Sequence, residues 1–361
     1  MNDATRDNRR KMWTRLRWGL QLGLVVLLLS ARAYGPNFSA FAGAEPAPAA
    51  ERAEWKADDK RPPEIPFPAN DPYTDAKAAL GKMLFFDPIL SGSGTQSCSS
   101  CHQPNLGWTD GQKVGIGVAP MTKHTPTLLN IAWIPVLGWD GHFPSLEKVA
   151  FGPITAPGIM NRPESELIAA LQARPPYAQA FAAAFPDHAV TRSHIEDALA
   201  TFERTIVSGE APFDRWIAGD EDAISPEAKR GFDVFNGKAG CAECHSGWNF
   251  TDAGFYDIGV GKGGDIGRAL VVPNSPKLKY AFKVPSLRDV ARRAPYMHDG
   301  SEPTLEAVID LYNLGGIDRP SRSELIKPLN LTEREKADLV AFLKTLSQEP
   351  ERTAAIPTLP R

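Results

Sequence analysis

Two stretches decide the fold of this chain: Cys98-Ser-Ser-Cys101-His102 and Cys241-Ala-Glu-Cys244-His245. Every cysteine of the sequence lies in one of them, and a histidine directly follows each pair. Two thiols three positions apart reach the two vinyl groups on one edge of a porphyrin, and the next residue then lies under the iron. This spacing is typical of c-type haem attachment, and the imidazole is an iron ligand. We therefore predict two covalently attached haem c groups, with His102 and His245 as proximal ligands.

The two cysteine pairs could have a function other than haem attachment. Two Cys-x-x-Cys pairs could build one Cys₄ zinc site, or they could act as redox-active dithiols. The histidine directly after both pairs and the absence of any further cysteine favour haem over both.

The rest of the sequence predicts a mainly α fold. Capping residues and apolar stripes mark helices that begin near Thr74, Ser193 with Glu196, Ser225, Thr304 and Thr332 with Glu335. A faint repeat, Gly-x-x-x-Phe, precedes each haem motif, at Gly81 and at Gly231. Alternating strand patterns are scarce, and 32 Pro and 30 Gly predict long irregular loops. The prediction is two tandem cytochrome c-like domains, each built round one covalent haem.

The ends of the chain are set apart by composition. A basic segment, an apolar run from Trp18 to Ala31 and the small-x-small sequence at 31–33 predict a signal peptide over residues 1–33. The apolar run is shorter than the ~20 residues of a membrane-spanning helix, so an uncleaved anchor is the less favoured alternative. We predict a flexible leader over 34–65, an N-terminal domain over 66–215, a C-terminal domain over 216–350 and a tail over 351–361. Export predicts a periplasmic protein.

Overall composition excludes several classes of function. The 361 residues are 42% hydrophobic and 23% charged, which is typical of a soluble globular protein rather than a disordered or polytopic membrane one. The formal net charge is −3, so no basic surface for nucleic acid is expected.

Six further strings carry a resemblance to a known family. They are residues 80–87 (LGKMLFFD), 125–130 (TPTLLN), 139–141 (WDG), 152–154 (GPI), 282–288 (FKVPSLR) and 294–301 (APYMHDGS). Together with the haem motifs, their order and spacing resemble the bacterial di-haem cytochrome c peroxidase and MauG superfamily over roughly residues 60–350. The resemblance implies a peroxide-reactive N-terminal haem and an electron-transferring C-terminal haem. It also implies hydrogen peroxide and either a small cytochrome or copper protein, or a protein oxidised on aromatic side chains, as partners.

Tyr312 is the position that separates branches of this family. It lies fourteen residues after His298, where the peroxidases carry a methionine ligand of the C-terminal haem and MauG-like members carry tyrosine. The resemblance therefore implies that Tyr312 ligates that iron as a phenolate, which favours ferric iron. Periodicity alone makes Tyr312 one more aromatic on an apolar stripe with Leu305, Val308 and Ile309.

Trp139 matches the family tryptophan that relays electrons between the haems. As a single residue, one of eight tryptophans, it could equally be a core side chain. The distal side of the first haem departs from the family pattern, because Val149 and Ile159 stand where a glutamine and a glutamate are expected. A peroxidase needs a group that moves a proton between the peroxide oxygens, and His142 is our candidate for that role.

Calcium bridges the haem domains in the family, partly through an asparagine and a threonine. His124 and Arg293 stand at these positions here, and both are poor replacements for hard oxygen ligands. We expect calcium binding to be absent or weak. The favoured function is an exported MauG-like or cytochrome-c peroxidase-like enzyme. The alternative is a non-catalytic di-haem electron carrier with the same fold, which the apolar residues Val149 and Ile159 favour.

Overall fold

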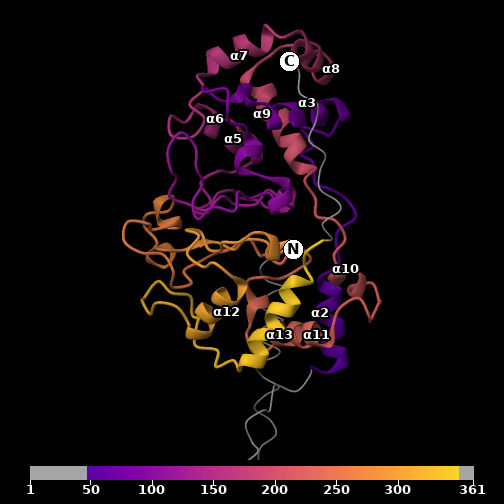
Figure 1. Ribbon diagram of the computed structural model, residues 1–361, viewed down its shortest axis with the longest axis vertical. Coiled ribbons are helices and arrows are strands. Elements are labelled where there is room, and N and C mark those ends of the chain that lie inside the picture. The colour runs from indigo at the N-terminus through magenta and orange to yellow at the C-terminus, as the bar shows by residue number, and fades with distance from the viewer. Residues whose placement is uncertain (1–46, 349–361) are drawn as a thin grey trace, which may run out of the picture. The chain divides into compact units, whose positions relative to one another are not determined.

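The computed structural model describes residues 47–348, and the predicted signal peptide, the first part of the predicted leader and the whole predicted tail lie outside this range. The chain is mainly helical, as predicted (Figure 1). Its α-helices are α2 (Ala49–Asp58), α3 (Asp75–Phe86), α4 (Cys98–Cys101), α5 (Leu146–Ala150), α6 (Gly152–Thr155), α7 (Glu164–Gln172), α8 (Pro175–Ala184), α9 (Arg192–Arg204), α10 (Pro212–Ile217), α11 (Pro226–Asn236), α12 (Leu305–Leu314) and α13 (Glu333–Lys344). The two strands, β1 (Phe255–Tyr256) and β2 (Phe282–Lys283), form one short antiparallel pair. Within the described range no helix has the length and apolar character needed to span a bilayer.

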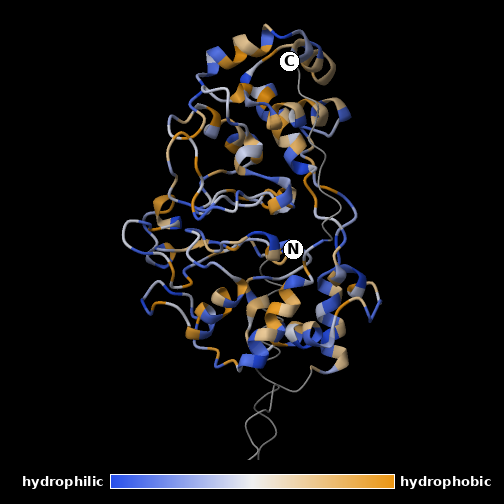
Figure 2. Ribbon diagram, in the orientation of Figure 1, coloured by the Kyte–Doolittle hydropathy of each residue, from blue (hydrophilic) through white to orange (hydrophobic). Residues whose placement is uncertain are grey.

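Each half of the chain has its own hydrophobic core. In the first half, α3 packs against α9, and the core includes Leu80, Phe85 and Leu199. In the second half, α11 packs against α13, around Phe232 and Phe342. The helices carry hydrophobic and hydrophilic residues side by side, as expected where one face is buried (Figure 2).

The glycines of the Gly-x-x-x-Phe repeat explain these two helix pairs. A Cβ on Gly81 would lie 1.9 Å from the carbonyl oxygen of Ala198, and a Cβ on Gly231 would lie 1.9 Å from that of Asp338. Only glycine permits so close an approach of the crossing backbone. The same crossing therefore occurs in both halves, and the repeat seen in the sequence is a repeat of structure.

Four of the five predicted helix starts are confirmed. Side chains of Thr74, Ser225, Thr304 and Thr332 accept hydrogen bonds from the first turns of α3, α11, α12 and α13. The start at Ser193 is wrong, because Thr191 caps α9 by accepting from the His194 amide at 3.2 Å. Thr191 and Ser193 are both good caps, so the local pattern did not distinguish them.

Part of the predicted leader is helical and packs on the second half. In α2, Arg52 pairs with Asp233 of α11, and the Trp55 ring lies edge-on to Phe232 at 5.9 Å. Beyond α2, Arg61 donates to the carbonyl oxygen of Gly209 at 3.0 Å. Leader residues therefore contact helix α11 and the segment that joins the two halves.

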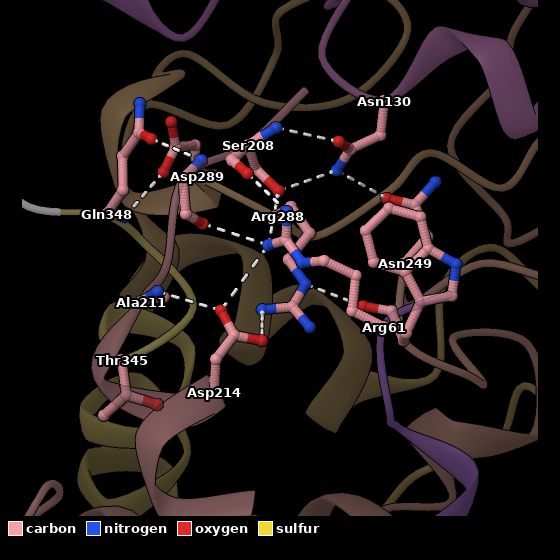
Figure 3. Close-up of polar contacts among 12 residues, drawn as sticks. Arg61, Asn130, Ser208, Ala211, Asp214, Asn249, Arg288, Asp289, Thr345 and Gln348 are labelled. Carbon is pink, nitrogen blue, oxygen red and sulfur yellow. Dashed lines mark hydrogen bonds and ion pairs between the residues drawn. The ribbon is translucent and has the colours of Figure 1, made fainter. Parts of the chain in front are cut away.

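A buried polar cluster fastens that joining segment to both halves (Figure 3). Asn130 of the first half accepts from the Ser208 amide at 2.9 Å and donates to Asn249 of the second half at 3.0 Å. Arg288, which is fully buried, donates from Nε to the Trp248 carbonyl at 2.6 Å and pairs with Asp214 at 2.8 Å. Because buried polar groups are costly unless paired, this network fixes the path of residues 206–214.

Candidate haem sites

The two haem motifs have matching local geometry. In the first, the His102 ring donates from Nδ1 to the Trp108 carbonyl at 3.2 Å, and in the second the His245 ring donates to the Phe250 carbonyl at 2.9 Å. A carbonyl can only accept, so Nδ1 carries the proton and Nε2 keeps its lone pair. Burial lowers the pKa of both histidines, which favours the neutral form that binds metal. Each histidine is thus held in the tautomer that a proximal iron ligand requires.

The four cysteines do not converge on one centre. All four are free thiols, and burial raises the pKa of each. Between residues 47 and 348 no three His, Cys, Asp or Glu side chains are placed to hold one metal ion. Such a geometry does not match a shared Cys₄ zinc site, which needs four thiolates round one ion.

A large cavity lies beside the second motif. It has a volume of about 260 Å³ and is lined by Cys241, Cys244, His245 and Tyr312 together with apolar residues of α12 and α13. Leu305, Val308 and Ile309 are among these residues, and so are Leu339 and Leu343. Thiols and an imidazole at one side of an apolar cavity fit a porphyrin, which is a large apolar plate with vinyl groups at one edge.

Tyr312 faces this cavity from α12. Burial raises its pKa, and so do the neighbouring groups Cys241 and Cys244, which places the phenol close to the second motif. No hydrogen bond contributes to that change in pKa. A partly buried phenol needs a polar partner, and ligation of the second iron by Tyr312 stays a prediction.

Trp139 joins the two halves. Its indole Nε1 donates to the His124 carbonyl of the same half at 2.7 Å, while its own carbonyl accepts from the Lys283 amide of the second half at 2.8 Å. The His124 amide in turn donates to the His298 carbonyl at 2.8 Å. The rings of Trp139 and His298 are 6.5 Å apart, and both line the cavity.

His142 does not line this cavity. It is exposed, and its ring contacts Phe143. A catalytic role for His142 therefore stays a prediction without a supporting contact. Val149 and Ile159 are partly buried and pack against hydrophobic clusters of the first half.

The contacts of His124 and Arg293 are unsuited to calcium, and weak or absent calcium binding stays a prediction. The His124 ring donates from Nδ1 to the Gln112 carbonyl at 2.8 Å, and the Arg293 guanidinium donates to the Ser286 carbonyl at 2.5 Å. A nearby guanidinium repels a divalent cation, and neither group is a hard oxygen ligand.

Sequence reasoning missed one group at this cavity. The ammonium of Lys283 lines it and donates to the Val136 carbonyl at 3.0 Å. Burial lowers the Lys283 pKa to about 8. Lys283 stands inside the FKVPSLR string, but a lysine on a short strand gives no sign in the sequence that its end is buried.

The helical fold and the paired motifs define a c-type cytochrome with two haems. The description "Di-haem cytochrome c peroxidase" matches residues 75–222, and "Cytochrome c" matches residues 228–347. The chain is 52% identical to the methylamine utilization protein MauG of Methylorubrum extorquens, over 85% of this chain and 88% of that protein. It is 38% identical to the cytochrome-c peroxidase IdrP1 of a Pseudomonas species, over 82% of this chain and 88% of that protein.

A solved structure has the same fold as this chain. A MauG-like protein associated with microbial copper homeostasis superposes with a TM-score of 0.75 at 33% identity, over 80% of this chain and 95% of that one. The chain belongs to the di-haem cytochrome c peroxidase and MauG family, and its similarity to MauG fits the MauG-like branch. The predictions of two tandem cytochrome c-like domains, two covalent c-type haems and a di-haem oxidoreductase are confirmed. The predicted domain boundaries stay predictions.

Proposed function

We propose that this protein is a periplasmic MauG-like enzyme that reduces hydrogen peroxide at the N-terminal haem and withdraws electrons from a protein. Two electrons and two protons convert one peroxide into two waters. The electrons come from two molecules of a small cytochrome or copper protein, or from aromatic side chains of a protein substrate. The observation that carries the proposal is the cavity that brings Tyr312 together with the second haem motif and with Trp139.

The chain's own residues have the following proposed roles. Cys98 and Cys101 hold the first haem and Cys241 and Cys244 the second. His102 and His245 bind iron on the proximal side, and each is oriented by a backbone carbonyl. Tyr312 would be the second protein ligand of the iron that His245 holds, since both side chains line the same cavity. When bound, the haems supply redox-active iron that accepts and releases electrons.

Trp139 is the proposed route for electrons between the haem sites. Its hydrogen bond to His124 and its backbone contact with Lys283 fix the indole where the two halves meet. An indole is readily oxidised, so at this position it could pass electrons between the two haems. Since these contacts hold the ring rigidly, electron transfer through it needs no rearrangement of the chain.

The attachment residues can be tested by counting haem. A Cys98→Ala/Cys101→Ala variant and a Cys241→Ala/Cys244→Ala variant should each carry one covalent haem in the pyridine haemochrome assay, where the wild type carries two. Both variants should also unfold more easily, because each half packs on its porphyrin and cofactor binding is coupled to folding. A variant that still held two covalent haems would contradict the assignment.

The enzymatic proposal can be tested by mixing the ferric protein with one equivalent of peroxide. We expect a rapid and defined spectral change, followed by oxidation of a reduced donor protein. Trp139→Phe should slow the oxidation of the donor. Trp133→Phe, at a partly buried tryptophan that contacts Trp248 at 4.8 Å, is the matched control and should not. Slow bleaching of the wild type without a defined product would favour the electron-carrier alternative, which the apolar Val149 and Ile159 support.

Metal removal gives a separate prediction. Because His124 and Arg293 are unsuited to calcium, treatment of the holoprotein with a chelator should leave its absorption spectrum and its melting temperature unchanged. The control is the same protein with added calcium, which should also be unchanged. A spectrum that the chelator alters and calcium restores would refute this expectation.

A further inference from the structure

Arg293 is a buried cation without an anionic partner. It follows the short helix η7 (Val290–Arg292), and its side chain is 7% exposed. One guanidinium nitrogen donates to the Ser286 carbonyl, but Nε makes no hydrogen bond. Of residues 47–348, Asp289 supplies the carboxylate whose charge acts on Arg293, and it forms no ion pair with the guanidinium. Asp289 is already engaged with the Gln348 amide at 2.8 Å and with Arg292 at 3.6 Å.

The position of Arg293 links the two haem sites. Its aliphatic stem packs on the loop after the first motif, where a Cβ on Gly107 would lie 2.6 Å from the Arg293 Cγ. Arg293 also lines the cavity of the second motif, together with His245. It therefore lies at the second haem site and in contact with the first half.

Lys283 is a second unpaired cation in the same cavity. Its ammonium has three N–H donors, and one hydrogen bond, to Val136, is made within the described part of the chain. Burial is the sole cause that acts on its pKa, so no carboxylate approaches it. Two unpaired cations in a largely apolar cavity cost several kcal/mol unless a ligand supplies negative charge.

We propose that Arg293 and Lys283 are the binding groups for haem carboxylates. A haem presents its covalent vinyl edge to the cysteines and carries two carboxylates on the opposite edge. Charge-assisted hydrogen bonds from guanidinium and ammonium groups are the strongest that a carboxylate accepts. The pairing satisfies the free Arg293 Nε and the unused donors of Lys283. It rests on the haem assignment made above.

The experiment compares holoproteins carrying Arg293→Met, Lys283→Met and, as a matched control, Lys113→Met at an exposed lysine. Resonance Raman spectra report hydrogen bonding to haem carboxylates through their bending bands, and spectroelectrochemistry reports the potential of each haem. In both cavity variants we expect the carboxylate bands to shift. Loss of a cation should also favour the ferric state about tenfold, which is about 59 mV for one electron. The control should match the wild type.

Charge-conserving variants separate geometry from charge. Arg293→Lys should shift the carboxylate band while nearly keeping the potential, because the charge remains but the donor geometry changes. If Arg293→Met does not take up two haems, the carboxylate band of Arg293→Lys still tests whether Arg293 binds a haem carboxylate. Exchange of chloride for phosphate in the buffer should change nothing, since a free anion is not the partner.

The proposal fails if the variants carry two haems yet their carboxylate bands match the wild type. It also fails if the bands respond only to the buffer anion. Absence of covalent haem from the wild type would instead refute the proposed function itself, so the two failures are distinguishable.

Discussion

Replacing Tyr312 by methionine is expected to raise the potential of the second haem by a few tenths of a volt, within the range of about 0.8 V that axial ligands cover. Burial raises the pKa of this phenol, so the deprotonated form needs a strong nearby cation. Ferric iron is such a cation, and a phenolate in return stabilises the ferric state. A thioether is neutral and favours the reduced state. Spectroelectrochemical titration of the wild type and of Tyr312→Met measures the difference.

Two further variants make this expectation specific. Tyr312→Phe should leave the second iron without its second protein ligand and change the spectrum of the ferric haem. Tyr296 lines the same cavity, and its hydroxyl donates to the Val290 carbonyl at 3.1 Å, so Tyr296→Phe is the matched control and should keep the wild-type potential. If the potential and spectrum of both Tyr312 variants equal those of the wild type, Tyr312 is a packing residue.

The sequence predicted the parts of this protein that depend on short-range chemistry. Each haem motif needs three fixed residues, two Cys and one His, within five positions. The helix starts at Ser225 and Thr304 depend on a hydroxyl and the next turn. The Gly-x-x-x-Phe repeat was visible in the sequence, whereas the close helix crossing at Gly81 and Gly231 came from the structure.

What the sequence did not predict depends on contacts between distant segments. Helix α2 packs through Arg52 and Asp233, which are far apart in the chain, and no local pattern pairs them. Lys283 has the sequence context of an ordinary surface charge, and only the fold buries its charged end. His142 is the opposite case, because its place directly after the Trp-Asp-Gly string indicated a pocket residue, whereas the structure exposes it.

A large loss of folding stability is expected when the buried polar cluster at the joining segment loses one of its charges. Asp214→Asn should lower the free energy of unfolding by about 3–5 kcal/mol, because it leaves the fully buried Arg288 without its charged partner. Asn is nearly isosteric with Asp, so the change removes charge and little volume. Urea unfolding of the holoprotein, followed by circular dichroism, measures the loss.

The pH of the measurement decides whether another acid can replace Asp214. Asp59 is buried near Arg288, and burial raises its pKa to about 7. At pH 6 Asp59 is mostly protonated and neutral, so it does not compensate, and the full effect of Asp214→Asn should appear there. Above pH 7 Asp59 ionises next to Arg288 and supplies the missing charge, so the variant should lose less stability relative to the wild type.

Two comparisons separate a lost charge pair from a general disturbance of the fold. Asp310→Asn removes a carboxylate that pairs with Lys336 at 2.8 Å on the surface, and it should cost less than about 1 kcal/mol. The double variant Asp214→Asn/Arg288→Met removes the buried cation as well and should be more stable than Asp214→Asn alone, since an apolar side chain of similar length needs no counter-charge. A double variant less stable than the single one would mean that Arg288 stabilises the joining segment through its hydrogen bond to Trp248 rather than through its charge.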